Sequence, residues 1–197
     1  MVTTSCDELA DACRSMRAHG WIRERDDRQR WIDANPQTDP RFLFVSQGYN
    51  LRMTEVSGAF GMHQVPRLEA FVERRRRNHR QWCAKIADLQ LPLRLYPELE
   101  NTRHAGFAFP LLLDANAPLS RAELCAKLEE RGIHSRPISG SNLARQPVFS
   151  SIPGAKIEGD LTVANAIHSR GLFVGQSHAF GDAHGDLLAS ALEEALR

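Results

Sequence analysis

The chain has 197 residues, of which 42% are hydrophobic and 25% are charged, and its formal net charge is +1. This composition is that of a globular chain long enough to bury a core. The near-neutral charge gives no reason to expect nucleic acid or an anionic membrane as a partner. No apolar run approaches the roughly 20 residues that span a bilayer.

Four cysteines are scattered along the chain, at Cys6, Cys13, Cys83 and Cys125. Because no CxxC pair or Cys/His ligand spacing occurs, neither a metal site nor a disulfide framework is predicted. Reduced thiols are typical of a cytoplasmic protein. The acidic residues within the first dozen positions argue against a signal peptide.

The chain opens on Met1–Thr4, which has the β-branched character of a short strand. A strand with nothing before it to pair with suggests that polypeptide is missing upstream. Ser5 and Glu8 have capping-box spacing and predict a helix through Met16, which Gly20 closes.

Residues 21–50 are predicted to be irregular, with prolines at 36 and 40 and aromatic residues that argue against disorder. Thr54 then begins a helix that continues to about Leu89, and Pro66 is expected to kink or split it. The arginine run from Arg74 to Arg80 indicates a solvated helical face rather than a nucleic-acid contact, since the total charge is neutral and no aromatic residues are interleaved.

Strand and helix patterns alternate from Gly106 onward, which predicts a small α/β or α+β layer domain. The expected strands are 107–113, 133–138 and 172–174. The expected helices begin at the Ser120–Glu123 capping box, at Asp160 and at Asp182, and Gly132 ends the first of them. Leu187, Leu188, Ala191, Leu192 and Leu196 are expected on one face of the last helix.

Motifs of several common enzyme classes are absent. The eight histidines include no HExxH pattern, so zinc is not predicted. Ser139-Gly140-Ser141 lacks the flanking glycines of a nucleophile elbow, and neither GxGxxG nor a P-loop occurs.

Two polar clusters remain as candidate binding elements. In the first, Tyr49, Asn50 and Arg52 follow Gly48 just ahead of the helix at Thr54, a place that suits a phosphate. A plain turn with a helix cap is the simpler alternative. The second cluster is the loop 135–147, where Arg136, Asn142 and Arg145 suit a hydroxyl-rich or phosphorylated ligand.

Together these segments resemble the DegT/DnrJ/StrS family of sugar-nucleotide aminotransferases. The resemblance rests on GYNLRMTEVSGAFGMHQVPRLEAFVERRRRNHR at 48–80 and on the opening segments 1–9 and 14–20. GIHSRPISGSNLARQPVF at 132–149 is most similar to the deoxysugar 3-dehydrase and lipopolysaccharide-synthesis branch.

The resemblance implies an α/β chain that is the C-terminal portion of a fold-type I enzyme dependent on pyridoxal 5'-phosphate (PLP), with active sites at a homodimer interface. Residues 1–90 would be the remnant of the large PLP-binding domain with a long connecting helix, and 91–197 the small C-terminal domain. Asn50 would contact the cofactor phosphate in the partner's active site, with Arg52 beside it. Tyr49, Arg136, Asn142 and Arg145 would face the sugar nucleotide.

One departure from the family concerns catalysis. The cofactor-binding lysine, or the histidine that replaces it in the 3-dehydrase branch, would precede Met1, as would the aspartate that pairs with the pyridine nitrogen. Lys85 and Lys127 fall on predicted helices and Lys156 in a loop, so no catalytic residue is assigned to this chain. The expectation is a fragment, a truncated gene model or half of a split gene.

Two functions stay open. As part of an enzyme, the chain would help to aminate a keto-deoxy sugar nucleotide, or to remove a hydroxyl group from it, for surface polysaccharide synthesis. Alternatively, it is a non-catalytic binding module, or it needs a separate N-terminal partner.

Overall fold

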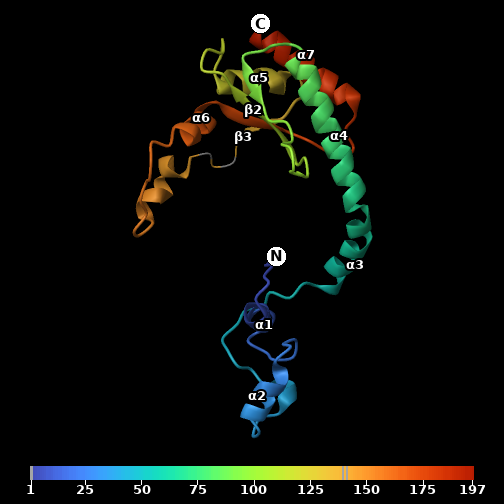
Figure 1. The fold of residues 1–197 in the computed structure, drawn as a ribbon, viewed down its shortest axis with the longest axis vertical. Helices are drawn as coiled ribbons and strands as arrows, with labels where there is room; N and C mark the ends of the chain where they lie inside the picture. The colour runs from blue at the N-terminus through green and yellow to red at the C-terminus, as the bar shows by residue number, and fades with distance from the viewer. Residues whose placement is uncertain (1, 139, 141) are drawn as a thin grey trace. The chain divides into compact units, whose positions relative to one another are not determined.

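The computed structural model describes residues 2–138, 140 and 142–197, and it divides into two compact units, Met1–Val65 and Pro66–Arg197. Figure 1 shows the elements of each unit. The units divide at residues 65 and 66, whereas the sequence placed the domain division at residue 90. The difference is the helix 68–87, which packs with the C-terminal unit.

Over its described residues, 2–65, the N-terminal unit contains three α-helices and few buried side chains. Its elements are α1 (Asp7–Met16), α2 (Arg28–Ala34), the 3-10 turn η1 (Pro40–Phe42) and α3 (Glu55–Gln64). Ala18, Ile22 and Leu43 are its buried apolar residues. A unit with so little buried apolar surface gains little stability from its own core.

Three expectations for this unit were wrong. The strand at Met1–Thr4 does not form over Val2–Thr4, and Met1 lies outside the described residues. The capping box at Ser5 is absent because α1 begins one residue later, after Cys6, without a side-chain cap. The irregular stretch 21–50 contains α2, where the Asp27 carboxylate accepts a hydrogen bond from the Trp31 indole at 3.2 Å.

The helix break at Pro66 is confirmed. Thr54 caps α3 by accepting a hydrogen bond from the backbone N–H of Ser57, and α3 ends at Gln64. The 3-10 turn η2 (Val65–Arg67) follows, and α4 (Leu68–Ala87) begins after it. Proline cannot donate the backbone hydrogen bond that a continuous helix needs at this position.

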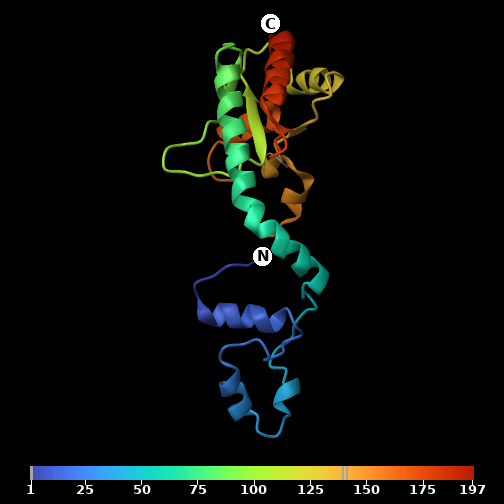
Figure 2. The ribbon, with the colours of Figure 1, turned by 90° about the vertical axis from the view of Figure 1, so that its right-hand side faces the viewer.

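The C-terminal unit is an antiparallel sheet with helices packed on it (Figure 2). The strands are β1 (Leu93–Leu95), β2 (Ala108–Leu113), β3 (Ser135–Pro137) and β4 (Gly171–Gly175), in the order β1-β2-β4-β3. The other elements are α4, α5 (Arg121–Glu130), η3 (Leu143–Arg145), η4 (Pro147–Ser151), α6 (Thr162–Arg170) and α7 (Asp182–Leu196).

Most of these elements agree with the sequence patterns. The Ser120–Glu123 capping box forms in full. Asp160 is not the cap of α6: its carboxylate accepts from the backbone N–H of Thr162 at 3.0 Å, but Leu161 occupies the N-cap position, without a side-chain cap. β1 was not expected, because three residues are too few for a visible alternation. Asp182 is the first residue of α7 rather than its cap, and Leu187 lies off the buried face, with 44% of its surface exposed.

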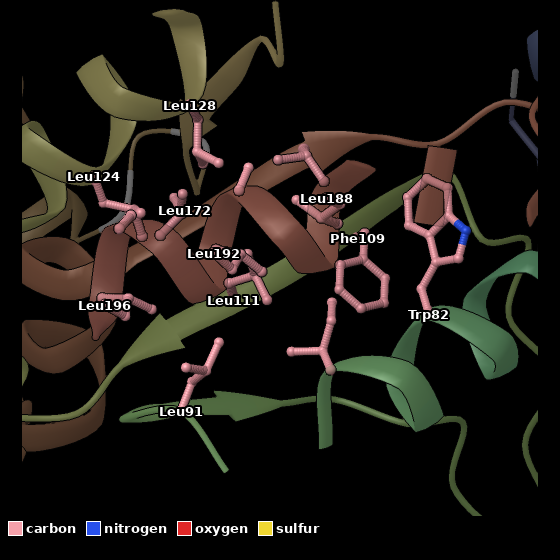
Figure 3. Packing of buried hydrophobic residues seen from close by; sticks show 14 of the residues in the cluster. Trp82, Leu91, Phe109, Leu111, Leu124, Leu128, Leu172, Leu188, Leu192 and Leu196 are labelled. Atoms are coloured by element: carbon pink, nitrogen blue, oxygen red, sulfur yellow. The ribbon is translucent and has the colours of Figure 1, made fainter. Parts of the chain in front are cut away.

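A single apolar cluster of 16 residues holds this unit together (Figure 3). Leu124 and Leu128 of α5, Leu188 and Leu192 of α7 and Phe109 of β2 all belong to this cluster, and Leu188 lies beside Phe109. The helices α4 and α7 approach closely at one point, where a Cβ on Gly185 would lie 2.5 Å from the Trp82 ring. Glycine at residue 185 therefore makes room for the indole.

The arginine run of α4 is less solvated than expected. Arg74 donates to the Phe180 carbonyl at 3.3 Å and Arg75 to the Ala105 carbonyl at 2.7 Å, while Arg76 binds the Glu98 carboxylate. Three of the arginines thus hold connecting segments against α4.

Replacing Leu192 by alanine should destabilise the C-terminal unit by about 2–5 kcal/mol, because the side chain is fully buried and the change leaves a cavity. Denaturant unfolding followed by circular dichroism measures the loss. Ser190→Ala, on the exposed side of the same helix, is the matched control and should change the free energy by less than about 0.5 kcal/mol. Equal effects of the two substitutions would contradict this assignment of the core.

Candidate functional site

The first predicted cluster lies on a strand-like segment of the N-terminal unit. Residues 49–51 run antiparallel to the turn that follows α1, and an isolated bridge joins Ala18 to Asn50. The backbone N–H of His19 donates to the Tyr49 carbonyl and that of Leu51 to the Arg17 carbonyl, both at 2.9 Å. The backbone at residue 50 is therefore held on both sides, while the Asn50 side chain is exposed.

Two glycines, Gly20 and Gly48, allow the backbone after α1 and the backbone before residue 49 to pass very close to each other. A Cβ on Gly48 would lie 2.4 Å from the backbone nitrogen of Gly20, and one on Gly20 would lie 1.8 Å from the Ser46 carbonyl oxygen. Gly20 also has a φ of +87°, in the region that favours glycine. The position of Asn50 follows from a backbone crossing that admits no side chains.

A carboxylate missed by the sequence analysis binds Arg52. Glu24 accepts from the Arg52 guanidinium at 3.2 Å and also pairs with Arg17. The hydrogen bond from Arg17, together with the nearby positive charges, lowers the pKa of Glu24. Since two guanidinium groups share one carboxylate, the cluster keeps a net positive charge beside Asn50, and Arg52 is held in place rather than free.

A cavity of about 560 Å³ in the same unit was also missed. Its lining residues include Trp21, Phe42, Arg23, Arg28 and Arg41, and the Arg41 guanidinium is paired with Asp39 at 2.6 Å. The Trp21 and Phe42 rings are stacked with centroids 6.2 Å apart, and Arg23 lies over Trp21 at 5.2 Å. Stacking surfaces beside cations suit a planar anionic ligand. No sequence motif marks this cavity, because its lining comes from separate turns.

The second predicted cluster belongs to the C-terminal unit, and its asparagine has a structural role. The Asn142 side chain is buried, its Nδ2 donates to Asn165 Oδ1 of α6, and its Oδ1 accepts from the backbone N–H of Ala144, both at 3.0 Å. Both ends of the amide are thus used within the protein. Asn142 holds the loop, and Ser139 and Ser141 lie outside the described residues.

Arg136 and Arg145 are exposed in this unit, Arg136 on β3 and Arg145 at the end of η3. No ion pair is formed by either guanidinium group with the residues that the structure describes. Tyr49 is likewise exposed, at 62% of its surface. These three side chains are available to a ligand, but Tyr49 belongs to one compact unit and the two arginines to the other.

The lysines lie where the sequence placed them. Lys85 on α4 pairs with Asp186 of α7, Lys127 is exposed on α5, and Lys156 is exposed in the loop after η4. None of the three belongs to the unit that contains Asn50.

Residues 2–138, 140 and 142–197 contain neither a metal-binding cluster nor a membrane-spanning helix. No group of three or more His, Cys, Asp or Glu side chains there is placed to hold a metal ion. No helix in that part of the chain combines the length and apolarity of a membrane span.

Asn142→Ala should loosen the loop 142–151 locally by about 1–3 kcal/mol, because it removes a buried amide with two hydrogen bonds. Hydrogen exchange of the loop amides, measured against those of β2, reports the change. The exposed Arg145→Ala is the control and should leave exchange unchanged. Unaltered exchange in Asn142→Ala would contradict this structural role and would leave the Asn142 amide as a candidate ligand-binding group.

Comparison with known proteins gives consistent matches over nearly the whole chain. A GDP-4-keto-6-deoxy-D-mannose 3-dehydratase of Yersinia pseudotuberculosis is 36% identical over 179 residues, which cover 88% of this chain and 44% of that protein. A lipopolysaccharide biosynthesis protein of Salmonella typhimurium is 30% identical over 156 residues, covering 79% of this chain and 36% of that protein.

Solved structures match the fold as well. The E coli GDP-4-keto-6-deoxy-D-mannose-3-dehydratase with bound hydrated PLP superposes with a TM-score of 0.81 at 26% identity, covering 99% of this chain and 49% of that one. The chain thus spans about half the length, or less, of the proteins it matches. The model of the DegT/DnrJ/EryC1/StrS aminotransferase family matches residues 1–193, and the chain belongs to this family.

Proposed function

We propose that this chain is the C-terminal part of a PLP-dependent aminotransferase or dehydratase that acts on a keto-deoxy sugar nucleotide in surface polysaccharide synthesis in the cytoplasm. The observation that supports it best is the exposed Asn50 side chain on a backbone held from both sides, beside the positively charged Arg17–Glu24–Arg52 cluster. In this proposal residues 1–90 belong to the large domain and 91–197 form the small domain.

The residues present fit one part of a PLP site. The Asn50 amide can donate to a phosphate oxygen, and the net charge of the adjacent cluster favours an anion. Arg52 supports this contact from its ion pair with Glu24, 3.2 Å away. No lysine lies in the same unit. PLP, when bound, would supply an electron sink for the reaction. In this proposal no residue of this chain holds PLP covalently.

The relatives and the cavity support the proposed substrate class. The Yersinia relative is named for a GDP-linked keto-deoxy sugar. In this chain, Trp21 and Phe42 offer stacking surfaces beside Arg23, Arg28 and Arg41, which suits the base and the diphosphate of a nucleotide. We propose Tyr49, Arg136 and Arg145 as weaker contacts to the sugar nucleotide, with Asn142 acting through the shape of its loop.

The partner in this proposal is either a second copy of the whole protein or a missing N-terminal half. The exposed apolar residues of α3 support the need for a partner. None of its residues is buried, although Val56, Phe60 and Met62 each expose about two thirds or more of their surface. An apolar helix of this kind is normally covered.

A non-catalytic binding module is the second candidate, and it is favoured by one observation: all three lysines lie outside the unit of Asn50.

Treating the isolated chain with PLP and then borohydride should give no stoichiometric adduct at a single lysine. Mass spectrometry of the tryptic peptides measures it. Specific labelling of Lys85, Lys127 or Lys156 would show that the chain holds the cofactor itself.

In the full-length enzyme, Asn50→Ala should weaken PLP binding by about 1.5–3 kcal/mol, the value of a hydrogen bond to a charged group. Equilibrium dialysis measures the affinity, and the neighbouring exposed Gln47→Ala is the control. Because the contact is proposed to cross the dimer interface, mixing this variant with one that lacks only the cofactor-binding residue should restore one intact site per dimer. Unchanged PLP affinity would remove Asn50 from the site, whereas failure of mixing alone would place it in its own subunit's site.

A further inference from the structure

Another cavity, of about 280 Å³, lies in the C-terminal unit among α4, α7, β4 and the turn that leads into β3. Aliphatic side chains form much of its wall, from Ile133, Val174, Leu187 and Leu188. No lysine, arginine, aspartate or glutamate belongs to the lining that the described residues form. Because nothing in this lining compensates a charge, the cavity favours an uncharged ligand.

The size of the cavity limits the ligand. An apolar protein cavity of roughly 150 Å³ holds a benzene molecule, so about 280 Å³ has room for two fused rings. Pockets for larger ligands start at roughly 300 Å³. The cavity is therefore too small to enclose the sugar nucleotide proposed above.

Three aromatic rings form one side of the cavity. The rings of Trp82 and Phe180 have centroids 6.3 Å apart and planes 19° apart, and His184 stacks on Phe180 at 4.4 Å and 12°. Trp82 lies at one end of the apolar cluster (Figure 3). Aromatic rings pair with each other more favourably than their buried area alone accounts for. Nearly parallel rings in the wall therefore favour a planar aromatic ligand.

His184 offers a hydrogen-bond donor at this cavity. Its Nδ1 accepts a hydrogen bond from the backbone N–H of Gly181 at 3.3 Å, so Nε2 carries the proton of the neutral ring. The side chain is exposed, and Nε2 has no partner among the described residues. The bond to Gly181 and the stacking on Phe180 fix the ring. An acceptor atom of a ligand can therefore bind Nε2–H without displacing a contact of the protein.

Trp82 contains a second unpaired donor. The side chain is 2% exposed, and its Nε1 is buried without a hydrogen-bond partner among the described residues. The edge that carries Nε1 lies beside α7, where a Cβ on Gly185 would be 2.7 Å from the nitrogen. The indoles of Trp21 and Trp31 both donate, at 2.9 and 3.2 Å. A buried donor without an acceptor costs free energy, so this position favours a ligand that supplies one.

The remaining polar side chain of the lining is already engaged. His134 has its Nδ1 3.0 Å from the Glu129 carboxylate. The two unengaged polar side chains of the lining, His184 and Trp82, are thus both donors. A ligand that matches this lining carries an acceptor atom.

We propose that this cavity is a binding site for a planar, uncharged aromatic molecule of one or two rings with an acceptor nitrogen or oxygen. The rings pack against Trp82, Phe180 and the aliphatic wall, and the acceptor binds Nε2–H of His184. The inference uses residues of the C-terminal unit alone. It does not depend on the cofactor or the substrate proposed above.

Titration of the 197-residue chain with quinoline, a planar molecule of two fused rings with one acceptor nitrogen, tests the inference. Near neutral pH, where quinoline is uncharged, it should bind saturably, with one molecule per chain. The ring current of the bound molecule should shift the indole N–H signal of Trp82 in the nuclear magnetic resonance spectrum. The signals of Trp21 and Trp31, in the other unit, should not move. The Trp82 signal is the one that remains when both of those residues are replaced by phenylalanine.

His184→Phe isolates the donor, because phenylalanine keeps a ring that can stack on Phe180 but lacks Nε2–H. Naphthalene has the shape of quinoline without its nitrogen. The preference for quinoline, measured as the ratio of the two dissociation constants, should fall about three- to tenfold in His184→Phe, the factor that one hydrogen bond supplies. His178→Phe is the matched control and should leave the ratio unchanged. His178 is an exposed histidine that stacks on Phe71 and does not line the cavity.

A variant that fills the cavity gives a second test. Leu187 lines the cavity and is 44% exposed, so Leu187→Trp should fold. It should weaken the binding of both probes by about tenfold or more, because the added ring occupies their space. Quinoline that fails to bind, or that binds without moving the Trp82 signal, would overturn the inference. An unchanged preference for quinoline in His184→Phe would overturn it equally.

Discussion

The N-terminal unit depends on a crossing of two backbone segments at Gly20 and Gly48. Neither position has space for a single added carbon atom, so the segments approach as closely as their backbones allow. The crossing aligns the turn after α1 with residues 49–51 and lets them exchange hydrogen bonds. The place of Asn50, the reach of Arg52 to Glu24 and the direction in which α3 begins all follow from this alignment.

The two units are stabilised by different means. Sixteen apolar residues between the sheet and its helices stabilise the C-terminal unit, which therefore has a core of its own. The N-terminal unit instead has a network of ion pairs and turns around Asp11, whose carboxylate accepts from the backbone N–H groups of Asp26 and Asp27. Exposed ion pairs contribute little to folding. The unit that contains the candidate cofactor contact thus gains less stability from apolar burial than the C-terminal unit.

Much of the C-terminal unit was predictable from the sequence because its signals are local. The capping box at Ser120, the break at Pro66 and the apolar run of β2 each depend on residues close in sequence. The failures have physical causes. α2 is short and held by Asp27, and Ser5 has cap chemistry but is one residue too early.

The candidate site was predictable only in part, for the same reason. Asn50 and Arg52 stand out because a glycine turn and a helix start flank them. Glu24 and the Trp21–Phe42 cavity do not, because they form when separate turns meet. Asn142 shows the opposite limit: its residue type suits a ligand, but its side chain is buried and each end of its amide makes a hydrogen bond within the protein.

The break at Pro66 has a practical consequence for dissecting this protein. All sixteen core residues lie between Trp82 and Leu196, so a shorter polypeptide that starts at Pro66 would retain every one of them. It would also retain α4, the segment 96–106 and the whole sheet. Such a piece would omit the apolar α3 and the glycine crossing, and would separate the unit with the large apolar core from the unit with few buried side chains.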